Sequence, residues 1–373
     1  MGTARRTTTW RGARTAIAVT ALAAGTVVVA PPASACACGG MVDNPAYETA
    51  VTAETAILQW DGETETMLLA LDALSNAPEV GLILPTPAPA EVALADPEVF
   101  RELDEITAPR AVVSATRWWP ELTFGTLGAE DGAAGSAPDV SVLAEVRLGP
   151  LDVTTLRARD TTALQGWLAD KGFELSPSIE RALAPYVKDE WSFVAARLAP
   201  EAATSFDGTL QPLRVTFPSD EIVYPMRMSS VAESTQNTRT YVLGDHRVDR
   251  QDATAEASAP DVRFAGRVEP ATVDSPELAA LLRQGDYVTS HEQVFTEPGT
   301  EILSDFAFVQ ASSDTPVVQS YAVVADKRIG PFFAGPVLVF GAFLALAVLV
   351  VWRSRRRRAP ARAPTASPHP ARA

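Results

Sequence analysis

Cysteine and histidine are scarce in this chain. Its 373 residues include two cysteines, Cys36 and Cys38, and three histidines. A structural zinc site needs about four ligands, and no histidine lies near the two thiols, so they do not form one. Their C-x-C spacing also differs from the C-x-x-C of thioredoxin-like redox sites. The pair therefore indicates neither a zinc site nor a redox site of that kind.

Sequence motifs of catalysis are missing as well. His246 and His291 are about 45 residues apart, without the H-E-x-x-H spacing of zinc hydrolases. The serine-hydrolase patterns G-x-S-x-G and S-x-x-K and the glycine-rich phosphate loops are absent. Acids are abundant, but sequence spacing cannot identify a glycosidase pair, and those in the loop 125–139 lack calcium-loop spacing. We assign no catalytic, cofactor-binding or metal-binding residue and expect no cofactor.

The N-terminus has the three parts of a secretory signal peptide. Residues 1–14 carry four arginines and no acid, and residues 15–30 are small or apolar. Ala33-Ser34-Ala35 then gives the small-x-small pattern of a cleavage site. We expect residues 1–35 to be removed during export. The alternative is an uncleaved anchor, but the apolar core is short and rich in alanine.

The C-terminal region contains a second apolar segment, residues 330–352, with 23 residues and no charge. As a helix it is roughly 34 Å long, enough to cross the ~30 Å hydrocarbon core of a membrane. Five arginines follow it: Arg353, Arg355, Arg356, Arg357 and Arg358. Because flanking arginines stay on the cytoplasmic side, they act as orientation determinants. We expect one transmembrane helix over 329–352 and a basic, disordered cytoplasmic tail over 353–373.

Net charge is unevenly distributed. The overall charge is −15, but four basic residues lie in the signal peptide and seven in the tail, which leaves 20 basic residues against 46 acids between them. A region with a balance of −26 lacks the basic patch that neutralises phosphates, so we expect no nucleic-acid partner. The membrane, through one span, and a protein of the cell envelope are the partners that we expect.

The exported region reads as α+β, mainly antiparallel hairpins with a few interspersed helices. Asp61-Gly62 between two apolar runs predicts a hairpin. Asp96 and Pro97 predict the start of a helix that ends before Pro109. Strict strand–helix alternation is absent, which argues against a doubly wound parallel sheet. We divide the region into halves, 36–150 and 151–328, joined to one C-terminal transmembrane helix.

Further segments along the chain complete this prediction. Helices are expected in TTALQGWLADKGF, PSIERALAPYV and SPELAALLRQG, and strands in EVGLILP, WSFVAARLAP, TRTYVLGDHRV and DYVTSHEQVFT. EIVYPMRMSS also reads as a strand. Residues 125–139 are expected to form a flexible loop, and the polar residues 250–260 a linker. Trp118 and Trp119 are either core or rim residues or an exposed patch for a saccharide or peptide.

The order of these segments resembles the bacterial family called domain of unknown function 2330. The resemblance rests on ACGG, ETAILQWDGETETMLLAL, GLILPTPAP, FRELDEITAPR, LQGWLADKGFELSPSIERALAPYV, LQPLRVTFPSDEIVYPMRMSS and YVTSHEQVFTE, over residues 36–311. It implies an exported, membrane-anchored protein and brings no catalytic residues. Members often have further cysteines after the helix near residue 100, where this chain has RWWPEL, so the resemblance implies no disulfide framework here.

Cys36 and Cys38 are therefore interpreted through processing. Cleavage after Ala35 makes Cys36 the first mature residue, as lipidation requires, although Ala33 stands where a larger aliphatic residue is usual. Cleavage after Ala37 discards Cys36, and a local disulfide is geometrically tight. The two cysteines are candidates for processing, lipidation or a local bond.

Three hypotheses for function remain. The preferred one is a non-enzymatic, single-pass envelope protein that displays an acidic domain outside the membrane for a binding or structural role. The second is a membrane-anchored hydrolase whose site combines scattered acids with His246 or His291. The third is a subunit of a membrane complex.

Overall fold

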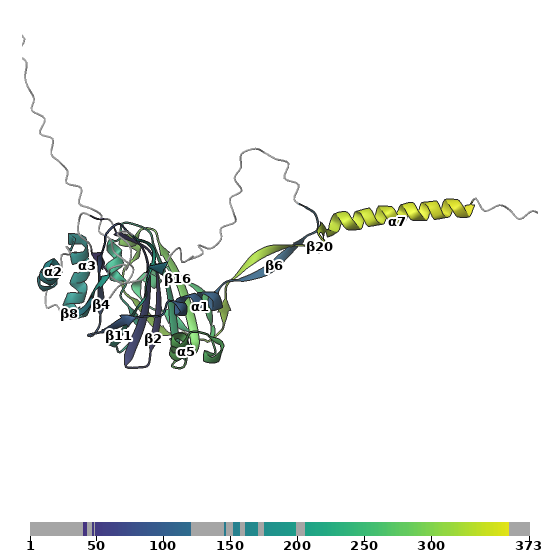
Figure 1. Ribbon diagram of the computed structural model, residues 1–373. Helices are drawn as coiled ribbons and strands as arrows, with labels where there is room; N and C mark the ends of the chain where they lie inside the picture. The colour runs from purple at the N-terminus through teal and green to yellow at the C-terminus, as the bar shows by residue number, and fades with distance from the viewer. Residues whose placement is uncertain are drawn as a thin grey trace, which may run out of the picture. The chain divides into compact units, whose positions relative to one another are not determined.

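The protein is described from a computed structural model over residues 40–42, 47, 49–120, 145–146, 152–156, 161–170, 175–198 and 206–357. These residues form mixed α and β structure with mostly antiparallel strands, few helices and one long apolar helix near the C-terminus (Figure 1). The predicted fold class is confirmed. The signal-peptide residues, both cysteines and the loop 125–139 lie outside the described residues.

The central hairpin forms where the sequence predicts it. Strands β2 (Thr49–Trp60) and β3 (Thr64–Ser75) pair antiparallel on either side of Asp61-Gly62. The Asp61 carboxylate accepts hydrogen bonds from the backbone N–H groups of Glu63 at 3.0 Å and Thr64 at 2.8 Å. Gly62 has φ +100°, a conformation that glycine adopts without a steric penalty. The turn therefore fixes the register of the two longest strands.

The hairpin lies inside a large sheet of ten strands. Its main path runs in the order β18 (Val317–Val318), β15 (Asp261–Arg267), β16 (Tyr287–Phe295), β13 (Gln236–Gly244), β2, β3, β10 (Phe206–Leu210) and β7 (Glu145–Val146). Strand β11 (Leu213–Pro218) pairs with β3 and with β5 (Glu91–Leu94). Strands β13 and β2 pair in parallel, as do β10 and β7. The parallel pairs join strands that are distant in the sequence.

Two smaller sheets cover one face of the large sheet. One has the order β1 (Gly40–Val42), β4 (Val80–Thr86), β9 (Ser192–Leu198) and β8 (Asp152–Leu156), and the other β12 (Val223–Tyr224), β17 (Phe306–Gln310) and β14 (Val248–Arg250). Leu58, Leu69, Leu82, Val194 and Phe306 belong to the apolar core between these sheets. Every residue of β4 is buried, as expected for a strand covered on both faces.

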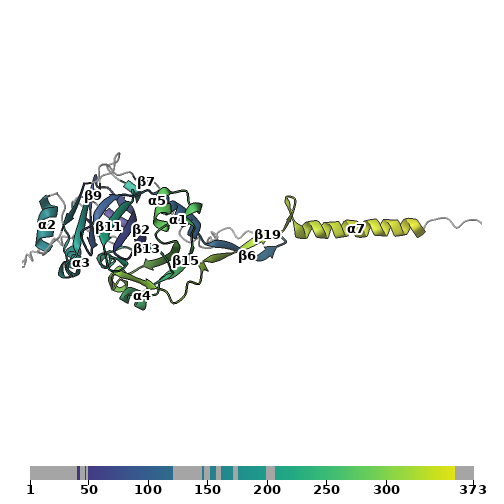
Figure 2. The same ribbon diagram turned by 90° about the horizontal axis from the view of Figure 1, so that it is seen from below.

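Helices form the outer layers. Helices α1 (Glu98–Thr107) and α5 (Pro276–Leu282) pack on the other face of the large sheet, where Leu68, Leu103 and Leu281 share a core. Helices α2 (Thr161–Asp170) and α3 (Pro177–Lys188) pack on β4 and β9 through Ile83 and Phe193. Figure 2 shows the two helix pairs on opposite sides of the strands. Short helical turns complete the described part: α4 (Ala253–Ala257), α6 (Pro298–Glu301), and the 3₁₀ helices η1 (Arg227–Val231) and η2 (Pro270–Thr272).

Three local predictions need correction. Residues 250–260 are not a linker, because Asp252 caps α4 and forms a buried ion pair with Arg250. The strand predicted in EIVYPMRMSS is only the two residues of β12, because Pro225 has no N–H to donate to a neighbouring strand. The chain then continues as the 3₁₀ helix η1. Helix α1 begins at Glu98 rather than after an Asp96 cap, although the Asp96 carboxylate accepts the Glu98 N–H at 3.0 Å.

Beyond the large sheet, a two-stranded ribbon leads the chain to its C-terminal helix. Strands β6 (Arg110–Arg117) and β19 (Ser320–Asp326) pair in parallel, followed by the short hairpin β20 (Arg328–Ile329) and β21 (Phe332–Phe333). Helix α7 (Ala334–Arg357) follows directly, and Figure 1 shows it in yellow after β20. It is long and apolar enough to cross a membrane, and only 11% of its most apolar window is buried in the protein. It is therefore not a core helix of the described domain.

Candidate functional site

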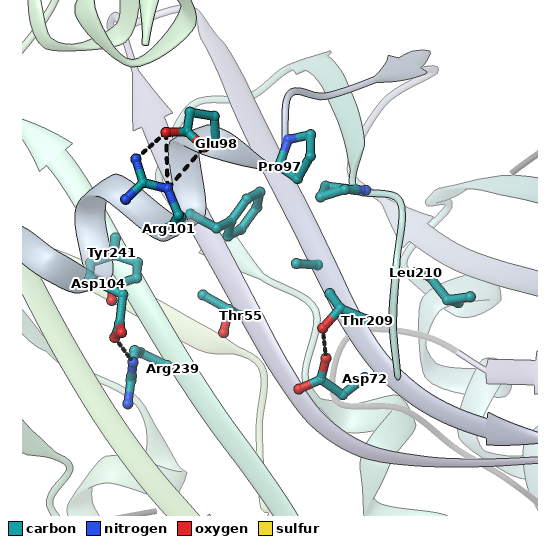
Figure 3. Close-up of a pocket in the computed structure, with 13 residues that line it drawn as sticks. Thr55, Asp72, Pro97, Glu98, Arg101, Asp104, Thr209, Leu210, Arg239 and Tyr241 are labelled. Atoms are coloured by element: carbon teal, nitrogen blue, oxygen red, sulfur yellow. Dashed lines mark hydrogen bonds and ion pairs between the residues drawn. The ribbon is translucent and has the colours of Figure 1, made fainter. Parts of the chain in front are cut away.

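A cavity of about 280 Å³ lies between α1 and the large sheet. Strands β2, β3, β10 and β13 form its floor, and the first turns of α1 form its roof (Figure 3). Its volume is near the lower end of the range for small-molecule sites. Phe100, Ala70, Leu210 and Pro212 give it an apolar lining, and charged side chains interrupt that lining. The cavity therefore combines apolar walls with ionisable groups.

Asp72 brings a carboxylate to this cavity through the alternation of β3. Leu68 faces the core beneath α1, so Ala70 and Asp72, two and four residues later, face the same side. Asp72 is half-buried, and the Thr209 hydroxyl donates a hydrogen bond to its Oδ1 (Figure 3). Burial raises the pKa of Asp72, and the Thr209 hydrogen bond opposes this increase. Among the described residues no cation forms an ion pair with Asp72.

The two arginines of the cavity, by contrast, are already paired. Arg239 on β13 is 9% exposed and contacts Asp104 of α1 and, at 3.5 Å, Glu292 of β16. Arg101 donates from Nε to Glu98 at 2.9 Å and also contacts Glu105. Each guanidinium therefore has two carboxylate partners, and the cavity has an excess of negative charge.

The roof of the cavity is held by reciprocal contacts between α1 and α5. The Glu102 carboxylate, buried on α1, accepts the N–H of Ser275 at 2.9 Å and that of Asp274 at 2.5 Å, at the start of α5. Glu277 of α5 in turn accepts the N–H of Asp96, just before α1, at 2.9 Å. These charge-assisted bonds satisfy backbone donors near both helix starts. The position of α1 above Asp72 is thus fixed from its far side.

This arrangement favours a small organic cation over an anion. An incoming amine would find a carboxylate with no cationic partner in a partly desolvated position, where a charge-assisted hydrogen bond is strong. An incoming anion would meet two guanidinium groups that each already contact two carboxylates. The apolar lining suits the hydrocarbon part of such an amine.

His246 lies in a different, open groove of about 610 Å³ at the end of the central hairpin, bordered by Trp60 and Asp61. It is exposed, and its Nδ1 lies 2.8 Å from Oδ2 of Asp314. The hydrogen bond with His246, with one from the Arg247 N–H, lowers the pKa of Asp314. The pair is therefore a surface contact between two loops.

His291 is enclosed instead, on β16 opposite Thr240 of β13. Neither of its ring nitrogens makes a hydrogen bond of normal geometry, and Phe308 packs 5.8 Å from its ring. Burial, reinforced by Arg250 and Arg247, lowers its pKa to about 3, so the ring is neutral at physiological pH. His246 and His291 both lie outside the lining of the α1 cavity.

Residues singled out from the sequence lie away from this cavity. Arg353, Arg355, Arg356 and Arg357 form the last turns of α7, and Arg356 stacks over Trp352 at 3.8 Å. Arg358, like Cys36 and Cys38, lies outside the described residues. Within the described ranges, no group of three or more histidine, cysteine, aspartate or glutamate side chains could hold a metal ion.

Sequence reasoning missed Asp72 and Arg239. Asp72 is the one charged residue in the stretch LLALDAL of β3, and Arg239 is the one charged residue in NTRTYVLG of β13. A charge within a largely buried stretch of strand is unusual, because burial requires a partner, and this was the available signal. Only the pairing of β13 with β2 and β16 shows that both residues line one cavity.

Comparison with known proteins gives the chain a family. A family model described as an uncharacterized protein conserved in bacteria, DUF2330, matches residues 32–309. The chain belongs to this family. The DUF2330 match includes every residue that lines the α1 cavity, and it ends before β18, β19 and α7. The resemblance seen in the sequence is confirmed.

The other comparisons add little about this DUF2330 protein. No curated protein matches the chain. Among solved structures, that of baculovirus P35 is similar with a TM-score of 0.29 and 8% sequence identity, covering 74% of this chain and 98% of that chain. A similarity at this TM-score supports no conclusion about function.

Proposed function

We propose that this DUF2330 protein is a single-pass envelope protein whose acidic outer domain binds a small organic cation in the α1 cavity. Asp72 carries this proposal, because it is a half-buried carboxylate in a cavity where both cations already have two acidic partners. A primary amine would bind Asp72, and its hydrocarbon part would lie against Phe100 and Leu210.

The proposed topology follows from the two ends of the chain. Residues 1–35 would be removed on export, the halves 36–150 and 151–328 would lie outside, 329–352 would span the membrane, and 353–373 would be cytoplasmic. The length and apolarity of α7 support the span, and the arginines from Arg353 to Arg358 support the orientation. Cleavage after Ala35 would make Cys36 the first mature residue and a candidate for lipidation, whereas cleavage after Ala37 would discard it.

The orientation is tested by an epitope fused after Ala373. In intact cells we expect antibody to reach it only after the membrane is permeabilised, whereas protease added outside should remove the outer domain. Labelling of the epitope in intact cells would contradict the orientation. The intact mass of the mature protein separates cleavage after Ala35, cleavage after Ala37 and lipidation of Cys36.

Cation binding is tested by thermal unfolding of the full chain in detergent with matched pairs of ligands. Benzylamine and n-butylamine are compared with benzyl alcohol and n-butanol, which have similar shapes and no charge. A ligand at 100 times its Kd stabilises by about 2.7 kcal/mol, so the amines should raise the Tm by a few degrees. Equal effects of amine and alcohol would refute a role for the Asp72 charge.

A further inference from the structure

The start of α7 is built from two segments that are far apart in the sequence. The Gly335 N–H donates to the Trp118 carbonyl at 2.8 Å, and the Ala334 N–H donates to the Lys327 carbonyl at 2.7 Å. The Lys327 N–H in turn donates to the Arg117 carbonyl at 2.8 Å. The end of β6 and the segment after β19 are therefore both hydrogen-bonded at the beginning of the apolar helix.

Trp119 packs directly on this junction. A Cβ atom added at Gly335 would lie 2.7 Å from the Trp118 carbonyl oxygen and 2.7 Å from the Trp119 ring, closer than such atoms approach. Gly335 thus allows the indole to lie against the backbone of the first turn of α7. Ala334 and Gly335 are buried, although the rest of α7 is largely exposed.

The aromatic side chains around this junction are nevertheless open to the outside. Trp118 is 43% exposed, Trp119 53% and Phe332 66%. Burial in a core therefore does not account for the Trp118-Trp119 pair. A cluster of exposed aromatics of this kind marks an interaction surface.

Cations accompany these rings. Lys327 Nζ lies 5.8 Å from the Trp118 ring centroid, and the Arg328 guanidinium lies 4.9 Å from that of Phe333. Asp326, the only acid in 110–120 and 317–333, is held by Arg117 and Arg328, each at 3.0 Å. Four cations against this one acid leave the two segments at +3, opposite in sign to the rest of the outer region.

We infer that these residues form a lipid-binding collar that lies among the headgroups of anionic phospholipids where α7 enters the membrane. The collar comprises Trp118, Trp119, Lys327, Arg328, Phe332 and Phe333. Its aromatic rings occupy the depth at which tryptophan is enriched in membrane proteins, and its cations face lipid phosphates. The collar is continuous with the apolar surface of α7, which is why the partner is lipid rather than a saccharide or peptide.

The collar has a structural consequence. Because Trp118 and Trp119 directly follow β6, their insertion ties the β6–β19 ribbon to the membrane surface at two points, through β6 as well as through α7. A single covalent connection would leave the ribbon free to swing about the start of α7. This inference rests on the proposed membrane span.

The test is tryptophan quenching by lipids brominated near the headgroup, with the full chain reconstituted in mixed phosphatidylcholine and phosphatidylglycerol vesicles. W118F/W119F should lose roughly two thirds of the lipid-quenched fluorescence, since Trp352 of α7 is the third indole expected at an interface. The single variants W118F and W119F should each lose about half as much. W60F removes an indole bonded to the Ser219 carbonyl in the domain and should lose none.

The outcomes separate this inference from the proposed span. If W352F reduces the quenched signal but W118F/W119F does not, the span stands and the collar is refuted. If W352F also has no effect, the span itself has failed. Recognition of charge is tested with K327Q/R328Q, which should lower the preference for phosphatidylglycerol about fivefold per charge in spin-labelled lipid measurements. An unchanged preference would overturn the role of the two cations.

Discussion

Replacement of Glu65 by glutamine is expected to remove a pH-dependent cost to stability. Glu65 lies on β3 with no exposed surface, beneath the edge where β12 packs. Its Oε2 accepts the Val223 N–H at 3.0 Å, and its Oε1 has no hydrogen-bond partner. Burial raises the pKa of Glu65 well above its usual range, Glu221 adds to the increase, and the Val223 hydrogen bond only partly offsets it.

The direction of the pH effect follows from proton binding. The folded state keeps a proton on Glu65 at pH values where the unfolded state, with a glutamate pKa of about 4.3, has lost it. The stability that Glu65 contributes is therefore fully present below about pH 4 and falls as the pH rises toward the folded pKa. The loss is about 1.4 kcal/mol for each pH unit over which Glu65 stays protonated in the folded state.

Glu65→Gln should be as stable as the wild type near pH 4 and increasingly more stable above it. Glutamine preserves the acceptor for the Val223 N–H and is neutral at every pH. The assay is urea unfolding of the full chain in detergent at several pH values between 4 and 7, with Glu63→Gln, exposed in the same hairpin, as the control. A difference between Glu65→Gln and wild type that does not grow with pH would refute the reasoning.

Two further substitutions test the core and the cavity by the same unfolding assay. Asp252→Asn should destabilise the fold by about 3–5 kcal/mol, because it leaves Arg250, which is 1% exposed and stacked on Phe306, without its carboxylate partner. The control Asp249→Asn, at an exposed pair with Arg247, should change stability by less than about 1 kcal/mol. Equal effects of the two substitutions would contradict the account. Ala70→Leu should fill the α1 cavity and abolish the Tm shift caused by benzylamine, with little change in the free energy of unfolding. The control Ala73→Leu, directed into the packed core on the other face of the sheet, should lower the free energy of unfolding by about 1–3 kcal/mol. A Tm shift retained in Ala70→Leu would place the ligand elsewhere.

Local signals in the sequence predicted individual elements well. Asp61-Gly62 gave the central hairpin, and Ser275-Pro276 marks the start of α5, where the Ser275 hydroxyl accepts the Leu278 N–H at 3.2 Å. These features depend on a few neighbouring residues, so their patterns are visible without the fold. The same reasoning failed for residues 250–260, because the Arg250–Asp252 pair is buried by residues distant in the sequence, among them Phe306 of β17 and Gln293 of β16.

The candidate site could not be predicted in this way. Asp72 and Arg239 line one cavity only because β13 pairs in parallel with β2, an arrangement with no turn signature between the strands. The collar likewise joins Trp119 to Gly335, and the sequence left Trp118 and Trp119 open between packing and recognition. Composition and apolar length predicted the C-terminal helix, whereas contacts between distant segments defined both proposed sites.

Calorimetric titration of benzylamine into the full chain, Asp72→Asn and Asp207→Asn is the most direct test of cation binding in the α1 cavity. Asp207→Asn makes the same change of charge on β10 at an exposed position that does not line the cavity. A hydrogen bond to a charged group contributes about 1.5–3 kcal/mol, so Asp72→Asn should weaken binding by about 10- to 150-fold, and Asp207→Asn should leave it unchanged. Equal affinity in Asp72→Asn and the wild type would contradict the account.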